Sequence, residues 1–343
     1  MTISNNQIIL ANRPVGIPDG DTFKFTKSNL DPLNEGQILI KTLYISVDPY
    51  MRGRLADTKS YIEPFKVNEV IQGGVVGEVI ESTSDQYNEG DIVIGMYGWQ
   101  EYFIANENEV RKIDPSLAPI TTHLGILGMT GLTAYFGLLK IGQPKKGDTV
   151  VVSGAAGAVG SAVGQIAKLH GARVVGIAGS DEKITFLKDE LHFDEAINYR
   201  TTTDIERDLK DACPNGVDVY FDNVGGSISD AVFAQLNRQA RIPVCGAISA
   251  YNLEKPDIGP RVQSMLIKNS VLMQGFTVGD YSNEFKEASI QLAQWLQEDK
   301  LKYRETIVEG FDQIPTAFLH LFEGKNVGKL LVKVADPSSK SIS

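Results

Sequence analysis

The sequence SGAAGAVGSAVGQIAK, from Ser153 to Lys168, decides the fold because it places glycine at positions 154, 157, 160 and 164. It follows the apolar run DTVVV (148–152) and opens an alanine-rich helical pattern that Gly171 ends. Glycine inside a helix costs about 1 kcal/mol relative to alanine, so this spacing indicates a close approach to the backbone. A turn between a strand and a helix N-terminus suits a pyrophosphate. The alternative is a tight packing turn without a ligand.

The chain from Asp148 onward alternates apolar runs with stretches of helix length. These runs are TVVV at 149, RVVGIA at 173, EAINY at 195, VDVYF at 217, RIPVCG at 241 and VLMQGF at 271. Six such runs predict an α/β domain with a six-stranded, doubly wound parallel sheet of the Rossmann type.

The chain before Pro119 has a different pattern, with short apolar runs punctuated by glycine. The runs GQILIKTLYISV, VIQGGVVGEVI, GDIVIGMYGW and EYFIAN predict a small β-rich unit. Near the other end, SNEFKEASIQLAQWLQEDK predicts an amphipathic helix with Phe285, Ile290, Ala293 and Leu296 on its apolar face. The last apolar run, GKLLVKV at 328–334, predicts one more strand.

Composition limits the class of protein and its partners. The net charge of −10 argues against nucleic acid, because a phosphate backbone needs a basic face. The two cysteines, Cys213 and Cys245, form no disulfide framework, which fits a reducing cytoplasm. The first ten residues, MTISNNQIIL, lack a basic region followed by an apolar run, and no 18 consecutive residues are apolar. We therefore expect a cytoplasmic protein without export or membrane insertion.

The end of the second strand of the doubly wound domain indicates which dinucleotide binds. NAD-binding proteins usually place a carboxylate there for the ribose 2′-hydroxyl. Here Gly179 and Ser180 stand at the strand end, and Lys183 follows within one helical turn. An uncharged strand end with a nearby lysine favours a 2′-phosphate and hence NADP(H), although an ordinary solvated lysine is the alternative. We interpret Asp181 as a helix cap and not as a ribose ligand.

The sequence predicts no zinc site. Zinc needs clustered cysteine, histidine or carboxylate ligands. The histidines are scattered through the chain, at positions 123, 170, 192 and 320. Cys245 lies in an apolar strand, where a small buried hydrophobe is the simpler interpretation.

Several segments together resemble a known family. They are SVDPYMRGRL, IQGGVVGEVIES, GMTGLTAYFGLL, SGAAGAVGSAVGQIAK, AGSDEK, NYR, YFDNVGG, CGAISAYN and GKLLVKV. They resemble the zinc-independent branch of the medium-chain dehydrogenase/reductase superfamily and, within it, the NADP-dependent alkenal/enone reductases, the group of prostaglandin and curcumin reductases. The likeness covers nearly the whole chain.

The resemblance implies the domain organisation and the cofactor contacts. A GroES-like substrate domain is expected from 1–125, completed by 305–343, with the NADP-binding domain at 126–304 inserted between them, and the chain is expected to form a homodimer. The implied NADP contacts, with Ser180 and Met129 added from their positions, are Gly157, Ala158, Val159, Gly160, Ser180, Lys183, Tyr199, Asn223, Cys245, Gly246, Ala247, Ile248, Ser249, Tyr251, Phe276, Thr277, Val278, Asn326 and Met129. Met129 is equally consistent with core packing. Val327 stands where many relatives have an arginine.

The chemistry that the resemblance implies is reduction of the carbon–carbon double bond of an α,β-unsaturated ketone or aldehyde, a small-molecule substrate, without a metal. Negative charge then builds on the carbonyl oxygen and needs hydrogen-bond donors. Tyr251 is the first candidate for that donor, and Tyr50 is expected to orient the substrate. One alternative is an NADPH-dependent quinone oxidoreductase of the same superfamily. Another is a nucleotide-binding protein that has lost turnover.

Overall fold

The computed structural model describes residues 3–338, and the chain divides into two compact units. The first unit takes the chain up to Leu124, Glu305–Asn326 and the chain from Leu330 onward. The second takes Gly125–Arg304 and Val327–Lys329. In the described part of the chain, no helix is long and apolar enough to cross a membrane.

The second unit is built on a six-stranded parallel sheet in the order β10-β9-β8-β11-β12-β13. Its strands are β8 (Thr149–Ser153), β9 (Arg173–Ala178), β10 (Glu195–Asn198), β11 (Val217–Phe221), β12 (Leu236–Val244) and β13 (Leu272–Gly275). Counted along the chain this is the strand order 3-2-1-4-5-6 of dinucleotide-binding folds. All strands stay parallel, but the chain adds β9 and β10 on one side of β8 and the later strands on the other side. The six apolar runs thus confirm the predicted doubly wound sheet.

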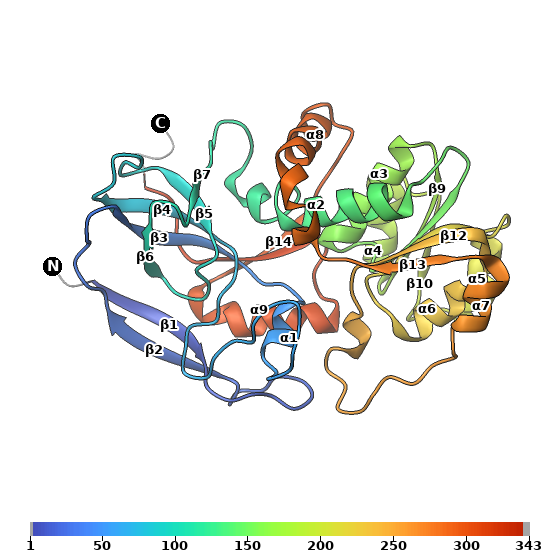
Figure 1. The fold of residues 1–343 in the computed structure, drawn as a ribbon, viewed down its shortest axis with the longest axis horizontal. Coiled ribbons are helices and arrows are strands. Elements are labelled where there is room, and N and C mark those ends of the chain that lie inside the picture. The colour runs from blue at the N-terminus through green and yellow to red at the C-terminus, as the bar shows by residue number, and fades with distance from the viewer. Residues whose placement is uncertain (1–2, 339–343) are drawn as a thin grey trace. The chain divides into compact units, whose positions relative to one another are not determined.

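Helices cover both faces of this sheet (Figure 1). The face that packs into one apolar cluster carries α2 (Met129–Phe136), the π-helix η2 (Gly137–Gly142), α3 (Ala158–Leu169), α4 (Asp181–Thr185) with the π-helix η3 (Phe186–Glu190), and α8 (Phe285–Gln297). The other face carries α5 (Ile205–Ala212), α6 (Gly226–Phe233) and α7 (Gln263–Asn269). Two short 3-10 helices, η4 (Ile248–Ala250) and η5 (Val278–Glu284), follow β12 and β13.

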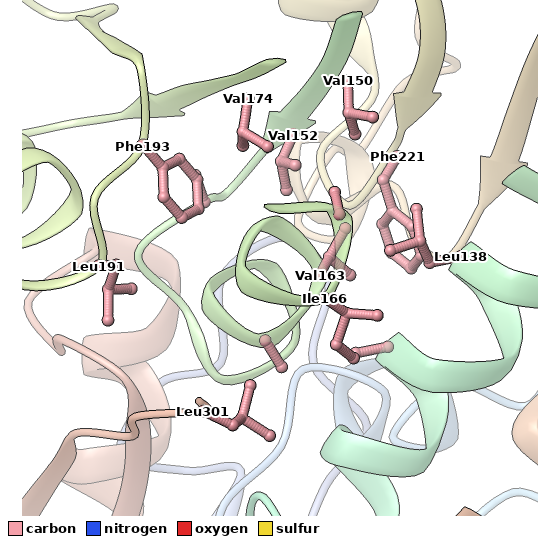
Figure 2. Packing of buried hydrophobic residues seen from close by; sticks show 14 of the residues in the cluster. Leu138, Val150, Val152, Val163, Ile166, Val174, Leu191, Phe193, Phe221 and Leu301 are labelled. Atoms are coloured by element: carbon pink, nitrogen blue, oxygen red, sulfur yellow. The ribbon is translucent and has the colours of Figure 1, made fainter. Parts of the chain in front are cut away.

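Helix α3 lies at the centre of the first apolar cluster (Figure 2). Val163 and Ile166 of α3 are fully buried in this cluster, and Gly164 lies opposite Phe193. A Cβ built on Gly164 would come within 1.9 Å of the Phe193 ring. This glycine is therefore explained by contact between the helix and an aromatic side chain, without any ligand.

We expect Gly164→Ala to lower the free energy of unfolding by about 1 kcal/mol. Overpacking a core costs about 1–3 kcal/mol, which outweighs the gain of about 1 kcal/mol in helix propensity. Chemical denaturation measures the change. Gly279→Ala is the control, because no atom lies closer than 3.9 Å to its added Cβ. A Gly164→Ala protein as stable as the parent would contradict the packing argument.

The first unit contains a seven-stranded sheet and a separate two-stranded sheet. The larger sheet has the order β14-β15-β3-β4-β5-β7, with β6 also pairing with β3. Its strands are β3 (Gln37–Ser46), β4 (Val75–Ser82), β5 (Ile92–Gly95), β6 (Tyr102–Asn106), β7 (Arg111–Lys112), β14 (Glu305–Glu309) and β15 (Lys329–Lys333). The unit also has the helices α1 (Met51–Arg54), η1 (Ile120–Leu124), η6 (Phe311–Gln313) and α9 (Ile314–Glu323). The predicted β-rich unit and final strand are confirmed.

Two details differ from the sequence-based expectation. The two-stranded sheet, β1 (Ser4–Leu10) paired with β2 (Phe23–Asn29), was not among the predicted strands, because β2 is largely exposed and gives little hydrophobic signal. In α8 the predicted apolar position Ile290 is wrong, since its side chain is 61% exposed. The buried positions are Ala288 and Leu292, one residue pair spaced by four.

Candidate active site

The turn after β8 leads directly into the N-terminus of α3. Gly154 has φ of +59°, a left-handed conformation that glycine adopts without strain, and Gly157 is the N-cap of α3. A Cβ on Gly160 would lie 2.4 Å from the Gly154 carbonyl oxygen, so close packing within the turn accounts for this glycine. The glycine spacing in this turn therefore has two causes, turn geometry at Gly154 and packing at Gly160.

This helix N-terminus fits a pyrophosphate. Within the described residues, the N–H groups of Val159 and Gly160 have no acceptor, and no side chain caps the helix. Their partial positive charge favours an anion. On the other side of the turn, the Gly328 N–H donates to the Ala156 carbonyl oxygen at 2.7 Å. Asn326 precedes that contact in the chain and belongs to the first unit.

The carboxyl end of β9 carries the groups predicted for a 2′-phosphate. Ser180 is the N-cap of α4, and its Oγ accepts a hydrogen bond from the Lys183 N–H at 3.3 Å. The Tyr199 ring lies against Gly179, where an added Cβ would come within 2.9 Å of the tyrosine. Burial and the nearby Arg200 guanidinium lower the pKa of Lys183. Lys183 and Arg200 thus both place positive charge near the carboxyl end of β9.

Two points at this strand end differ from the sequence analysis. Asp181 was interpreted as the helix cap, but Ser180 performs that role, and Asp181 Oδ1 instead accepts from Asn198 Nδ2 at 2.8 Å. Arg200 was not identified as a site residue, although it stands in the quoted segment NYR. Its guanidinium lies 5.9 Å from the centre of the Tyr199 ring.

The carboxyl ends of β11 and β12 bring the next predicted residues together. Asn223 donates from its side-chain Nδ2 to the Ser153 carbonyl oxygen at 2.8 Å, beside the pyrophosphate turn. The segment Cys245–Ser249 runs along the residues after β11, with the N–H of Ile248 donating to the Asn223 carbonyl oxygen at 3.4 Å. Burial and Asp222 raise the pKa of the Cys245 thiol to about 12, so it stays protonated.

Tyr251 closes this loop with its phenol folded back on the backbone. Its Oη accepts a hydrogen bond from the Ala247 N–H at 3.3 Å. An accepting phenol oxygen keeps its own hydrogen for a second partner. Burial raises the pKa of the Tyr251 phenol, which keeps it a neutral donor at physiological pH.

The residues after β13 lie on the same edge of the sheet. Phe276 packs against Gly137, where an added Cβ would come within 2.3 Å of the ring. Thr277 is the N-cap of η5 and forms a capping box with Asp280. Val278 begins η5. Met129 is the first residue of α2 and is 38% exposed, so it is not part of the buried core.

Tyr50 lies in the first unit, where it precedes α1. Burial and the neighbouring Asp48 raise the pKa of the Tyr50 phenol, while Arg54 opposes this shift. The Arg54 guanidinium is itself fixed by its Nε donating to the Glu63 carbonyl oxygen at 2.9 Å and by lying 4.0 Å from the Phe65 ring centre. The phenol is therefore held neutral beside a well-packed cation.

No group of three or more His, Cys, Asp or Glu side chains within residues 3–338 is arranged to hold a metal ion. The predicted lack of a zinc requirement remains a prediction.

Comparison with known proteins gives the family. Residues 6–113 match the model for the N-terminal domain of oxidoreductases, and residues 158–295 match the zinc-binding dehydrogenase model. The chain is 43% identical to the NADPH-dependent curcumin reductase of Escherichia coli, over 96% of this chain and 97% of that protein. It belongs to the medium-chain dehydrogenase/reductases.

Other relatives place the chain more narrowly within this superfamily. It is 64% identical to YfmJ of Bacillus subtilis over 98% of this chain and 100% of the relative. It is 40% identical to the NADP-dependent 2-alkenal reductase of Nicotiana tabacum, over 97% of this chain and 98% of that protein. The structure of CurA from Vibrio vulnificus in complex with NADPH superposes with a TM-score of 0.92 at 46% identity, covering 97% of this chain and 100% of that one.

The chain is thus a member of the alkenal reductase group of medium-chain dehydrogenase/reductases, a family of NADP-dependent oxidoreductases. The predicted family, enzyme class and NADP(H) dependence are confirmed at this level. The roles of individual site residues, the homodimer and the cytoplasmic location remain predictions.

Proposed function

We propose that this enzyme reduces the carbon–carbon double bond of α,β-unsaturated aldehydes and ketones. The observation that carries the proposal is the hydrogen bond from the Ala247 N–H to the Tyr251 phenol oxygen. Because this oxygen is the acceptor, the phenol keeps its own hydrogen to donate to a substrate oxygen. Relatives named 2-alkenal reductase and curcumin reductase support this substrate class. When bound, NADPH supplies the hydride that the β-carbon of the substrate receives.

Tyr251 acts where charge develops. As the β-carbon receives hydride, negative charge builds on the substrate carbonyl oxygen, and a neutral phenol donates a hydrogen bond to it. The raised pKa of Tyr251 keeps the phenol protonated, so it remains a donor throughout the physiological range. Protonation of the α-carbon then completes the reduction.

The second unit acts in this proposal as the NADP-binding domain. The N–H groups of Ala158, Val159 and Gly160 bind the pyrophosphate, and Ser180, Lys183 and Tyr199 bind the 2′-phosphate. Asn223, Cys245–Tyr251, Phe276–Val278, Asn326 and Met129 are assigned to the nicotinamide half of the cofactor. The first unit acts as the substrate domain, in which Tyr50 orients the substrate.

Isotope transfer tests the reaction directly. We expect NADPH deuterated at the transferred position to deliver deuterium to the β-carbon of a trans-2-alkenal, as read by mass spectrometry of the product. A quinone is offered separately, because solved structures named as quinone reductases share the fold at 21% and 16% identity. Quinol formation with no label in the alkenal would move the enzyme to the quinone reductases. Oxidation of NADPH by neither acceptor would favour a binding protein without turnover.

We also propose that two copies associate through β13. This strand is an edge of the six-stranded sheet, and all four of its residues are exposed, among them Leu272 at 49% and Met273 at 38%. An exposed apolar edge strand readily pairs with another chain.

We expect light scattering to give the mass of two chains for the parent protein and of one chain for Met273→Lys, because a charged edge residue opposes strand pairing. Ile290→Lys is the matched control, since Ile290 is 61% exposed on α8 and is not part of a strand edge. A parent protein that scatters as one chain would reject the homodimer.

A further inference from the structure

A buried carboxylate that the proposed reaction does not use lies directly after β11. Asp222 is only 3% exposed. Its Oδ1 accepts hydrogen bonds from Tyr220 Oη at 2.9 Å, Val224 N at 3.0 Å, Gly225 N at 2.9 Å and Ser153 Oγ at 3.1 Å. Its Oδ2 accepts from Ser229 Oγ at 2.6 Å. A buried charge is tolerated when it is this fully hydrogen-bonded.

The Asp222 network reaches Asn223 through one hydroxyl group. Ser153 Oγ donates to Asp222 and at the same time accepts from the Asn223 N–H at 2.9 Å. The Asn223 side chain then donates to the Ser153 carbonyl oxygen at 2.8 Å. Asp222 thereby fixes the Ser153 hydroxyl group that accepts from the Asn223 backbone, and the Asn223 side chain is bound to the same residue at the end of β8.

The same turn also holds the loop that carries Tyr251. The Asp222 carbonyl oxygen accepts from the N–H groups of Cys245 at 2.8 Å and Gly246 at 3.1 Å. The Val224 carbonyl oxygen accepts from the N–H of Ser249 at 3.1 Å and from its Oγ at 2.6 Å. Any displacement of the Asp222 turn is therefore passed to the loop and to the Tyr251 phenol.

Stability of the sheet gives little reason for a carboxylate at this position. Replacing buried ionic networks by well-packed apolar groups is often neutral or stabilising. A carboxylate with five donors, in contrast, fixes the direction of each group that it binds, which is what an active site requires of its supporting residues.

We propose that Asp222 is a positioning residue that holds Asn223 in place for the cofactor and holds the Cys245–Tyr251 loop in place so that Tyr251 can donate its hydrogen bond to the substrate oxygen. The second half of this inference rests on the proposed role of Tyr251, whereas the first half concerns cofactor binding alone. The experiment therefore has a binding arm and a turnover arm.

Asp222→Asn is the test variant, because the amide keeps the shape of the side chain and an acceptor at the Oδ1 position while removing the charge. In the binding arm we expect the NADPH dissociation constant, measured by fluorescence titration, to rise about tenfold or more. In the turnover arm we expect kcat with a trans-2-alkenal to fall about tenfold to hundredfold, since misplacement by about 1 Å has effects of this size. In the Tyr251→Phe background the same substitution is expected to change kcat less than about threefold. The free-energy effects of two substitutions add when the sites are independent, and they do not add when one site acts through the other.

Asp218→Asn is the matched control on the same strand. Asp218 accepts from the Thr149 N–H at 2.8 Å and from Asn237 Nδ2 at 2.8 Å, near the start of β11. We expect this variant to lose stability without changing the NADPH dissociation constant or kcat. If Asp222→Asn does not fold, Ser229→Ala removes a single donor from Oδ2 and is expected to shift both quantities in the same directions by smaller factors.

An unchanged NADPH dissociation constant in Asp222→Asn, or equal effects of Asp222→Asn and Asp218→Asn, would overturn the proposal. Losses of kcat that add fully with Tyr251→Phe would also overturn it, because they would show a general structural effect. If the parent enzyme reduces no alkenal, the proposed function has failed, and the binding arm alone decides the role of Asp222.

Discussion

Tyr251→Phe is expected to lower kcat for a trans-2-alkenal by about 10²–10³-fold, the usual cost of removing one donor from a developing oxyanion. The dissociation constant of NADPH should stay within about twofold, because phenylalanine keeps the ring and removes only the hydroxyl group. Stopped-flow measurement of hydride transfer, with the cofactor bound in advance, separates these two quantities.

The pH dependence of the reaction gives a second measurement of the same donor. The raised pKa of Tyr251 means that the neutral phenol persists to a higher pH than in an ordinary tyrosine. The rate should therefore hold through neutral pH and fall only as pH rises through that pKa, where the phenolate can no longer donate. In Tyr251→Phe this alkaline fall should disappear.

Tyr135→Phe is the matched control for Tyr251→Phe. Tyr135 lies on α2 in the same unit and packs on Phe136 and Trp295, with ring centres 5.3 and 6.0 Å apart. Its hydroxyl is assigned no part in the chemistry, so full turnover is expected. Full turnover in Tyr251→Phe as well would remove Tyr251 from the mechanism and leave the substrate oxygen to another donor.

The sheet could be predicted from the sequence because each buried parallel strand is a local apolar run. The runs at 149, 173 and 217 became β8, β9 and β11, and their order follows from the doubly wound topology. Local patterns also located the helix that starts at the glycine turn. These strands and this helix start are determined by residues that are close together in the sequence, so the sequence alone is enough to predict them.

The reasons for individual residues were harder to predict where the partner is distant in sequence. Gly164 was one of four glycines whose spacing indicated a close approach to the backbone, and at this position the structure explains it by the ring of Phe193. Asp222 stood in the quoted segment YFDNVGG without a role. Four of its five hydrogen-bond donors are local, but Ser153, through which it reaches the Asn223 N–H, is 69 residues away. The local signal that was available is a carboxylate directly after the apolar strand VDVYF, a position at which ligands bind in open α/β sheets.

Lys183→Ala is expected to raise the dissociation constant of NADPH by about 10–100-fold and to leave that of NADH nearly unchanged. The difference arises because only NADPH carries the 2′-phosphate, and one hydrogen bond to a charged group contributes about 1.5–3 kcal/mol. Competition between 2′,5′-ADP and 5′-AMP, measured by calorimetry, isolates this phosphate from the rest of the cofactor. The loss should diminish at high salt, which screens the same attraction.

The chain offers a close control for this substitution. Lys188 lies five residues later, is exposed and forms an ion pair with Glu195 at 3.0 Å, so Lys188→Ala removes the same charge from the neighbouring surface. We expect its NADPH affinity to stay within about twofold of the parent, as screened surface charges have small effects. Equal losses in both variants would mean that only the net charge of this surface attracts the cofactor.

The pH dependence decides between a specific contact and a general field. Burial and Arg200 lower the pKa of Lys183, and a bound 2′-phosphate favours the protonated amine. NADPH affinity should therefore fall as pH rises through that lowered pKa, earlier than for an ordinary lysine, while NADH affinity stays level. Because Arg200 keeps its charge over this range, any preference for NADPH that remains in Lys183→Ala measures the contribution of the second cation.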